Sequence, residues 1–226
     1  MRQADNLMAA GARPAAAAQA VACDLILVTW NQLAYTRRCV ESLLQHTTVP
    51  CRLLIVDNGS RPDTIVYLDA LQRDHPDRVL CLKQPTNLGW VRGVNAGLRA
   101  ATAPYVCLLN NDLILLPGWL ERMLAVAESD PTIGLVNPTY NIKGEPLDSF
   151  TRRIQSGEAG GRPSAYLEVG ECNGACLLIR RRVLETIGGL DEIYGTDGMD
   201  DSDFSRRAEL AGFRCARARQ AWVFHW

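Results

Sequence analysis

The sequence lacks several features that would decide its class at once. It contains no run of about 20 apolar residues, the length that a membrane-spanning helix requires. Acidic and basic residues nearly balance, with a formal net charge of −1, so no overall charge attracts the chain to nucleic acid or to an anionic membrane. Neither a G-x-G-x-x-G turn nor a G-x-x-x-x-G-K-[ST] loop is present, which excludes the common dinucleotide oxidoreductases and P-loop enzymes.

Cysteine is abundant but lacks the spacing of a metal site. The eight cysteines fall mostly in apolar runs such as CRLLIV and VCLL, which indicates buried free thiols in a reducing compartment more simply than disulfides. Cys172 and Cys176 do not form a C-x-x-C pair, and no second cluster accompanies them, which argues against zinc. With 226 residues, 47% of them hydrophobic, the chain can bury one large core.

The N-terminal stretch is rich in alanine but is interrupted by Asp5, Arg13 and Pro14. A secretory signal would need an uninterrupted apolar segment there, so a disordered lead-in over residues 1–22 is the favoured interpretation and a targeting segment the alternative. We expect one domain over residues 23–226.

Short apolar runs alternate with segments of helical periodicity along the first half of the chain. The expected strands are 24–29, 51–56, 78–82 and 105–109, and each precedes a segment in which apolar residues recur at helical spacing. Unbroken apolar strands that alternate with amphipathic helices predict an α/β fold, with a mostly parallel central sheet and helices on both faces.

Polar residues follow each of these strands, where ligands bind in such sheets. Any one of the groups has an ordinary explanation, because DNGS, for example, is a common turn sequence. Four together predict a single crevice at the carboxyl edge. The groups are Thr29 and Asn31; Asp57, Asn58, Gly59 and Ser60; Asn87 and Gly89; and Asn110, Asn111 and Asp112.

The stretch YVCLLNNDLIL places Asn110, Asn111 and Asp112 inside an apolar run. An unpaired buried polar group costs about 1–3 kcal/mol, so these side chains need a partner. A carboxylate at the mouth of the crevice repels phosphate unless a divalent cation bridges the two, which predicts Mg²⁺ or Mn²⁺ between Asp112 and a diphosphate. The alternative is that Asp112 caps the helix expected to begin at Pro117.

A set of motifs resembles those of the family 2 glycosyltransferases, in their rhamnosyltransferase-like branch. They cover residues 24–226 in the family's order: ILVTWN, LLIVDNGS, NLGWVRGVNAGLRAA, YVCLLNNDLILLPGWLERML, GACLLIRRRVLETIGGLDE and DDSDFSRRAELAGF. The resemblance implies the GT-A fold and transfer of a sugar from a nucleotide-diphospho-sugar with inversion at the anomeric carbon. It also implies a nucleotide-sugar-binding half at 23–115 and an acceptor-binding half at 116–226.

The resemblance further assigns roles to the residues of the donor half. Thr29 and Asp57 would meet the base and ribose, and NND would correspond to the family's D-x-D metal motif, with Asn110 in place of its first acid. Asn87, Gly89, Gly93, Asn95 and Gly97 would form the loop and helix start around the nucleotide. The donor-binding set is Thr29, Asn31, Asp57, Asn58, Asn87, Gly89, Asn95 and Asn111.

A second acidic cluster, Asp197, Asp200, Asp201 and Asp203, opens the segment DSDFSRRAELAG. One explanation is that these acids cap a helix and complement its dipole. The resemblance instead implies that Asp201 is the catalytic base, with Asp200 at a position where the family usually has glutamate. An acceptor hydroxyl must lose a proton as it attacks, so a carboxylate in this role suits the chemistry.

The remaining predictions concern the second half. Residues 142–169 show little periodicity and are expected to form a loop that borders the acceptor, together with Asn173 and Gly174. His225 matches a histidine that serves relatives as a metal ligand, and the alternative is a structural residue at a strand end. We also expect a further C-terminal region in the parent protein, through which it would associate peripherally with a membrane.

The expected function is an inverting, metal-dependent transfer from dTDP-rhamnose or a UDP-sugar to a glycan or lipid-linked acceptor. It would serve bacterial polysaccharide or cell-envelope synthesis in the cytoplasm, at the inner face of the membrane, with no nucleic-acid partner. Two other classes stay open. A nucleotidyltransferase would need a basic glycine-rich loop near the first strand, and a non-catalytic nucleotide-sugar-binding module would not need the second acidic cluster.

Overall fold

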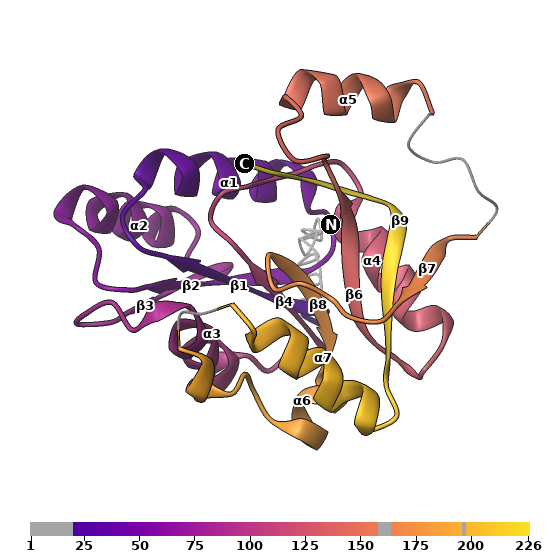
Figure 1. The fold of residues 1–226 in the computed structure, drawn as a ribbon. Coiled ribbons are helices and arrows are strands. Elements are labelled where there is room, and N and C mark those ends of the chain that lie inside the picture. The colour runs from indigo at the N-terminus through magenta and orange to yellow at the C-terminus, as the bar shows by residue number, and fades with distance from the viewer. Residues whose placement is uncertain (1–19, 158–163, 196–197) are drawn as a thin grey trace, which may run out of the picture.

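The computed structural model describes residues 20–157, 164–195 and 198–226, which form a nine-stranded sheet covered by helices (Figure 1). Most of the expected lead-in, residues 1–19, lies outside the described residues. The strands are β1 (Cys23–Thr29), β2 (Cys51–Asp57), β3 (Val79–Lys83), β4 (Tyr105–Leu109), β5 (Leu113–Leu115), β6 (Ile133–Tyr140), β7 (Tyr166–Val169), β8 (Cys176–Arg180) and β9 (Arg214–His225). The helices are α1 (Leu33–His46), α2 (Pro62–Asp74), α3 (Gly89–Ala100), α4 (Trp119–Ser129), α5 (Leu147–Gln155), α6 (Arg181–Ile187) and α7 (Asp200–Leu210), with a 3-10 turn, η1, at Glu192–Tyr194.

The strand order is β3-β2-β1-β4-β8-β6-β9-β5, and β7 pairs with β9. β1 to β4 are mutually parallel and β6 is parallel to β9, whereas β8 runs antiparallel to both β4 and β6. Only β5, β7 and β8 therefore oppose the other described strands. This mixed, mostly parallel sheet confirms the predicted fold class, and the antiparallel β8 brings its start to the carboxyl end of β4.

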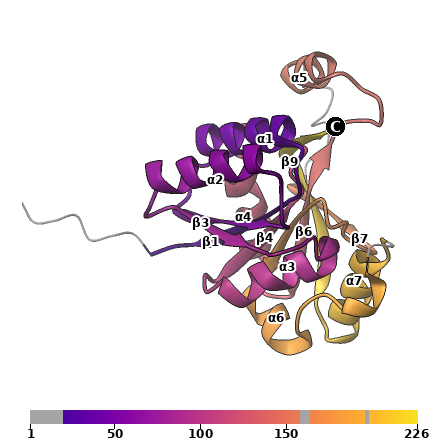
Figure 2. The ribbon, with the colours of Figure 1, turned by 90° about the vertical axis from the view of Figure 1, so that its left-hand side faces the viewer.

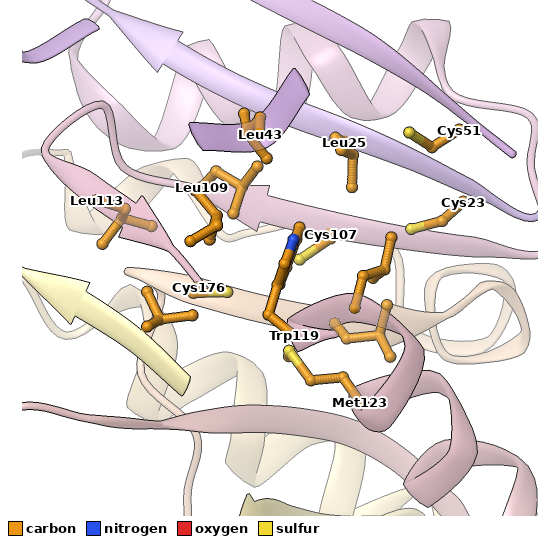
Figure 3. Packing of buried hydrophobic residues seen from close by; sticks show 14 of the residues in the cluster. Cys23, Leu25, Leu43, Cys51, Cys107, Leu109, Leu113, Trp119, Met123 and Cys176 are labelled. Carbon is orange, nitrogen blue, oxygen red and sulfur yellow. The ribbon is translucent and has the colours of Figure 1, made fainter. Parts of the chain in front are cut away.

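Helices cover both faces of the sheet, as predicted (Figure 2). α1, α2 and α4 contribute to one core cluster, and α3, α6 and α7 contribute to another on the opposite face. Trp119 from α4 is fully buried in the first cluster, near Cys107 and Met123 (Figure 3). The indole N–H of Trp119 donates to Thr47 Oγ1 at 3.1 Å. All eight cysteines are free, which confirms the prediction of free thiols.

The prediction of a loop throughout residues 142–169 is wrong. α5 and β7 lie within that range, although residues 158–163 between them are not described. α5 places Leu147, Phe150 and Ile154 on one side, packed against Trp222 and Phe224 of β9. The sequence did not reveal α5 because a helix of nine residues has too few turns to show a clear periodic pattern of apolar residues. β7 was missed because it is a short edge strand with an exposed, partly polar sequence.

One buried carboxylate connects the beginnings of β1, β2 and β4 by hydrogen bonds. Asp24 of β1 is fully buried and accepts both Nε and Nη2 of Arg52 on β2, at 2.8 and 3.0 Å. Its Oδ2 also accepts the backbone N–H groups of Thr102 and Ala103 ahead of β4. Burial alone would raise the pKa of Asp24, but the hydrogen bonds from Arg52, Ala103 and Thr102 lower it overall. Asp24 therefore ties together the three strands whose far ends carry the polar residues.

We predict that Asp24→Asn lowers the free energy of unfolding at pH 7 by roughly 3 kcal/mol, the low end for breaking a buried pair. The low end applies because the side chain of Arg52 stays 32% exposed. The folded pKa of Asp24 is depressed, so its contribution is complete above the unfolded value of about 3.9 and is lost as pH falls through the folded value. The free energies of unfolding of the parent and of Asp24→Asn should therefore approach each other as pH falls, and urea unfolding of both proteins from pH 7 to pH 2 measures this. A difference that does not change with pH would contradict the prediction.

Candidate active site

The carboxyl ends of the central strands meet at one edge of the sheet. In the parallel register, Thr29 at the end of β1 lies beside Asp57 at the end of β2. Beyond β4, the backbone N–H of Asn110 donates to Ala175 O at 2.8 Å, just before β8. Residues from both expected halves of the chain therefore contribute to the same edge.

A hydrogen-bond network links the ends of β1 and β4. The hydroxyl groups of Thr29 and Thr36 are 2.7 Å apart, and both are buried. The side-chain amide of Asn111 donates to Thr36 Oγ1 at 3.0 Å and to Thr29 Oγ1 at 3.3 Å. Part of the NND sequence thus finds its partners within the protein, and Asn111 holds the turn after β4 against α1.

Two buried oxygen atoms at the end of β2 have no hydrogen-bond partner among the residues that the structure describes. Asp57 Oδ1 accepts the N–H of Ser60, but Asp57 Oδ2 accepts nothing. The amide nitrogen of Asn58 donates to Gly89 O at 3.0 Å, and Asn58 Oδ1 is again unpartnered. Leaving such acceptors buried and unpaired is costly, so a bound molecule that donates hydrogen bonds would stabilise this site.

The loop after β1 is held in an unusual conformation beside these acceptors. Asn31 and Gln32 both have positive φ, 56° and 48°. The N–H of Asn31 donates to Ser60 Oγ at 2.8 Å, and its Oδ1 accepts the N–H of Arg61 at 2.8 Å. These bonds join the β1 and β2 loops, so Asn31 positions the loop that carries Asp57 and Asn58.

The start of α3 lies close to the same edge. Asn87 Oδ1 accepts the N–H of Gly89 at 2.9 Å and so shapes the turn into the helix. A Cβ on Gly97 would come within 2.4 Å of Ile26 Cγ2, and one on Gly93 within 2.9 Å of Val28 Cγ1. These two glycines let α3 pack directly on β1.

The structure does not bring Asn95 to this edge. Its amide nitrogen donates to Leu190 O and to Glu192 Oε1, at 2.9 and 3.3 Å, and its Oδ1 accepts the N–H of Leu190 at 3.0 Å. The side chain instead lines a different pocket, between α3 and α6. Asn95 therefore connects α3 to the segment before η1, and a contact with the donor stays a prediction.

Asp112 and His225 meet beyond the end of β4, where β9 ends. His225 is the last residue of β9 and pairs with Leu113 of β5, directly after Asp112. His225 Nε2 lies 3.3 Å from Asp112 Oδ1, without the alignment of a hydrogen bond, and that buried oxygen has no hydrogen-bond partner. α4 is preceded by Gly118 at its N-cap and Asp112 lies in the turn before β5, so the capping alternative for Asp112 is wrong.

This pair fits a divalent cation that takes further ligands from a substrate. A carboxylate oxygen without a hydrogen-bond partner and an imidazole nitrogen are ligand types for Mn²⁺ or Mg²⁺, and the nitrogen favours Mn²⁺. Asn110 lines the pocket that His225 also borders. Among the described residues no three His, Cys, Asp or Glu side chains form a metal cluster.

A pocket of about 390 Å³ lies next to this pair and is lined by two members of the second acidic cluster. Asp200 and Asp201, in the first turn of α7, line it together with Trp90, Gly174 and Asn173. Asp201 Oδ2 accepts the N–H of Gly174 at 3.1 Å, and Asp200 Oδ2 accepts the indole N–H of Trp90 at 3.1 Å. The structure thus brings the predicted catalytic acids to the predicted acceptor residues.

The other members of the acidic cluster do not share this position. Asp203 Oδ2 accepts Nε of Arg207 one turn later in α7, at 2.7 Å, which is a helix-stabilising pair. Asp197 lies outside the described residues. Met199 is the N-cap of α7, and no side chain caps it by a hydrogen bond. Asp200 and Asp201 can complement the helix dipole, but neither is the cap.

Asp200 and Asp201 have different surroundings. Burial raises the pKa of the Asp200 carboxyl. A hydrogen bond from its own backbone lowers it, the charge of Asp201 raises it further, and the Trp90 N–H lowers it. Asp201 is less buried and accepts two backbone N–H groups, from Gly174 and Ser202. Burial, the first of these causes, leaves the pKa of Asp200 above its ordinary value.

Two contributors were not identified from the sequence. Trp90 supplies the hydrogen bond to Asp200, and Tyr140 at the end of β6 donates its hydroxyl to Asn173 Oδ1 at 2.9 Å. The sequence predicts that the region of Trp90 lies near the nucleotide, because Trp90 follows Gly89 in the motif NLGWVRGVNAGLRAA. It could not reveal that the partner of Trp90 is Asp200, which is 110 residues away. No strand was expected around Tyr140.

Comparisons with known proteins identify the family of the chain and support its fold. The family model described as Glycosyl transferase family 2 matches residues 24–188. N-acetylglucosaminyl-diphospho-decaprenol L-rhamnosyltransferase of Mycobacterium tuberculosis is 28% identical over 234 residues, covering 89% of this chain and 75% of the relative. "Uncharacterized protein y4gI" of Sinorhizobium fredii is 28% identical over 221 residues, and the match spans only 24% of that protein.

A solved structure with a similar fold contains both a nucleotide-sugar and a metal. It is the mannosyltransferase PcManGT from Pyrobaculum calidifontis in complex with GDP-Man and Mn²⁺. The TM-score is 0.71 at 19% sequence identity, over 91% of this chain and 57% of that one. At this identity the likeness establishes the GT-A fold.

We predict that Trp90→Phe raises the pKa of Asp200, because phenylalanine keeps an aromatic ring but cannot donate to the ionised carboxylate. Carbon-13 NMR of aspartate-labelled protein would follow the titration, and Asp200→Asn would identify the signal. Trp30→Phe is the matched control, since Trp30 is 52% exposed. An Asp200 titration unchanged by Trp90→Phe would show that the Trp90 hydrogen bond has no electrostatic role.

Proposed function

The chain belongs to glycosyl transferase family 2, and from this membership we propose that it transfers a sugar, with inversion, from a nucleotide-diphospho-sugar to an acceptor hydroxyl. dTDP-rhamnose or a UDP-sugar is the proposed donor. The proposed acceptor is a glycan or lipid-linked sugar of bacterial polysaccharide or cell-envelope synthesis. The mycobacterial relative, a rhamnosyltransferase by name, supports this choice. None of the described helices has both the length and the apolar character needed to cross a bilayer.

One observation carries the proposal: a single edge of the sheet holds two acidic sites of different character. At the first, side-chain oxygens of Asp57, Asn58 and Asp112 are buried and accept no hydrogen bond from the described part of the chain. At the second, Asp200 and Asp201 line an open pocket. A nucleotide-binding module would need only the first site, whereas group transfer to a hydroxyl also needs a base.

The residues proposed to bind the donor and the metal have separate roles. Asp57 and Asn58 bind the nucleoside through their free oxygens, and Asn31 and Asn87 hold the loops that carry or adjoin them. Asp112 and His225 would hold a Mn²⁺ or Mg²⁺ ion, with Asn110 nearby, and the ion would neutralise charge on the departing diphosphate.

Asp201 takes the proton from the attacking acceptor hydroxyl. Its Oδ2 is oriented by the N–H of Gly174, and Asn173 lines the same pocket, where the acceptor would approach. Asp200 lies beside Asp201, is more buried, and accepts a hydrogen bond from Trp90.

Donor-dependent release of nucleoside diphosphate, with and without Mn²⁺, tests the proposal as a whole. A nucleotidyltransferase would instead release pyrophosphate, and a binding module would release neither.

We predict that Asp112→Asn weakens Mn²⁺-dependent donor binding by at least about tenfold, because an amide is a poor substitute for an anionic oxygen ligand. Binding of the nucleoside diphosphate without metal should change little. Isothermal titration calorimetry with and without Mn²⁺ separates the two effects. Asp77→Asn, at an exposed loop before β3, is the matched control. The same metal dependence in Asp112→Asn and in the parent would remove Asp112 from the metal site.

We predict that Asp201→Asn lowers turnover by at least about 10²-fold while donor affinity changes little, as expected for loss of a positioned general base. Asparagine retains the shape but cannot take the proton. Steady-state rates, together with thermal melting, distinguish this from unfolding. If Asp201→Asn kept the parent turnover while Asp200→Asn lost it, Asp200 would be the base instead.

A further inference from the structure

A second pocket shares a wall with the catalytic pocket. Its volume is about 550 Å³, within the range of roughly 300–1,000 Å³ typical of small-molecule sites. It lies between the end of β9 and the segment that leads into α5. His225 lines both pockets, so the second pocket borders the one that Asp200 and Asp201 line.

One side of this pocket is aromatic and fixed in place. The rings of Phe224 and Trp226 meet edge to face, 5.2 Å apart at 84°. Phe150 of α5 packs behind Phe224 at 6.0 Å, and Trp226 also contacts Tyr35 at 6.0 Å. Trp226 nevertheless remains 51% exposed. A fixed and accessible indole suits a ligand with a flat apolar face.

The polar groups of the pocket leave one acceptor free. Glu145 is already bound by Arg153, with both nitrogen–oxygen distances 2.9 Å. Asn141 is bonded to the backbone N–H and C=O of His225. Asp148, in the first turn of α5, is exposed and has no hydrogen bond or ion pair within the described part of the chain. Asp148 can therefore accept hydrogen bonds from a ligand.

The charge of the lining distinguishes between ligand classes. Arg153 compensates the charge of Glu145, so Asp148 is the acidic group of the lining that keeps an uncompensated charge among the described residues, and it disfavours a phosphate beside it. A nearby cation is Arg38, whose Cζ lies 5.6 Å from the centroid of the Trp226 ring. A neutral ring with several hydroxyl donors and an apolar face matches both the carboxylate and the indole.

We propose that this pocket binds a neutral sugar ring of the acceptor, next to the unit whose hydroxyl attacks, and not the phosphate group of a lipid carrier. The inference rests on the proposed transferase function and adds to it the chemical class of the acceptor. Asp148 and Trp226 are its binding residues. His225 lies at the boundary between this subsite and the reacting centre.

Sugar binding can be tested without knowing the acceptor. The probes are methyl glycosides of glucose, galactose, mannose, rhamnose and N-acetylglucosamine, with inorganic pyrophosphate as the anionic comparison. The protein has five tryptophans, so fluorotryptophan labelling gives few NMR signals, and Trp226→Phe identifies that of Trp226. We expect at least one glycoside to shift the Trp226 signal and pyrophosphate to leave it unchanged.

Asp148→Ala should weaken binding of that glycoside about tenfold, the effect of losing a hydrogen bond to a charged group. Asp77→Ala removes an equally exposed carboxylate elsewhere and should change nothing. The inference is overturned if no glycoside shifts the signal, if Asp148→Ala binds as the parent does, or if pyrophosphate binds instead. Donor binding and nucleoside diphosphate release by the parent protein, measured in parallel, show whether the proposed function itself has failed.

Discussion

Burial of β1, β2 and β4 on both faces is the constraint on which the site depends. These strands are apolar almost throughout because helices cover each side, so polar residues can occur only where the strands end. Asp24 is the exception at the opposite ends, and four hydrogen bonds compensate it there. With parallel register fixed in this way, the residues after each strand must meet at one edge.

The sequence predicted local elements well where the pattern was long and regular. β1, β2 and β4 lie at the expected strands 24–29, 51–56 and 105–109, and α1 and α2 follow the first two of them as expected. The errors lie in the second half, where β6 was not assigned and α5 was taken for loop. β6 pairs with β8 and β9, which are distant in sequence, and α5 is held by a small cluster around Phe150, so tertiary contacts decide these two elements more than local propensity does.

Contacts within the site that join distant parts of the chain were even harder to predict from the sequence than the elements of the second half. Most residues of the predicted donor set follow an apolar run, so their place at the edge could be inferred from the chain alone, whereas Asn95, inside α3, lies elsewhere. The pairing of Asp112 with His225 could not be derived from spacing, because it depends on the antiparallel contact of β5 with β9. The hydrogen bond between Trp90 and Asp200 likewise joins α3 to α7 across 110 residues. Only the resemblance to a family gave roles to residues whose contacts are so distant.

A short series of contacts connects the end of β2 to Asp200 in the first turn of α7. Asn58 Oδ1 has no hydrogen-bond partner among the described residues, and the amide nitrogen of Asn58 donates to Gly89 O. Trp90, the next residue, donates from its ring to Asp200. α3 is itself pressed onto β1 because Gly93 and Gly97 permit close approach. The distance between the end of β2, where we propose that the donor binds, and Asp200, beside the proposed base, is therefore set by a strand and one helix. Such rigid supports hold reacting groups more accurately than loops do.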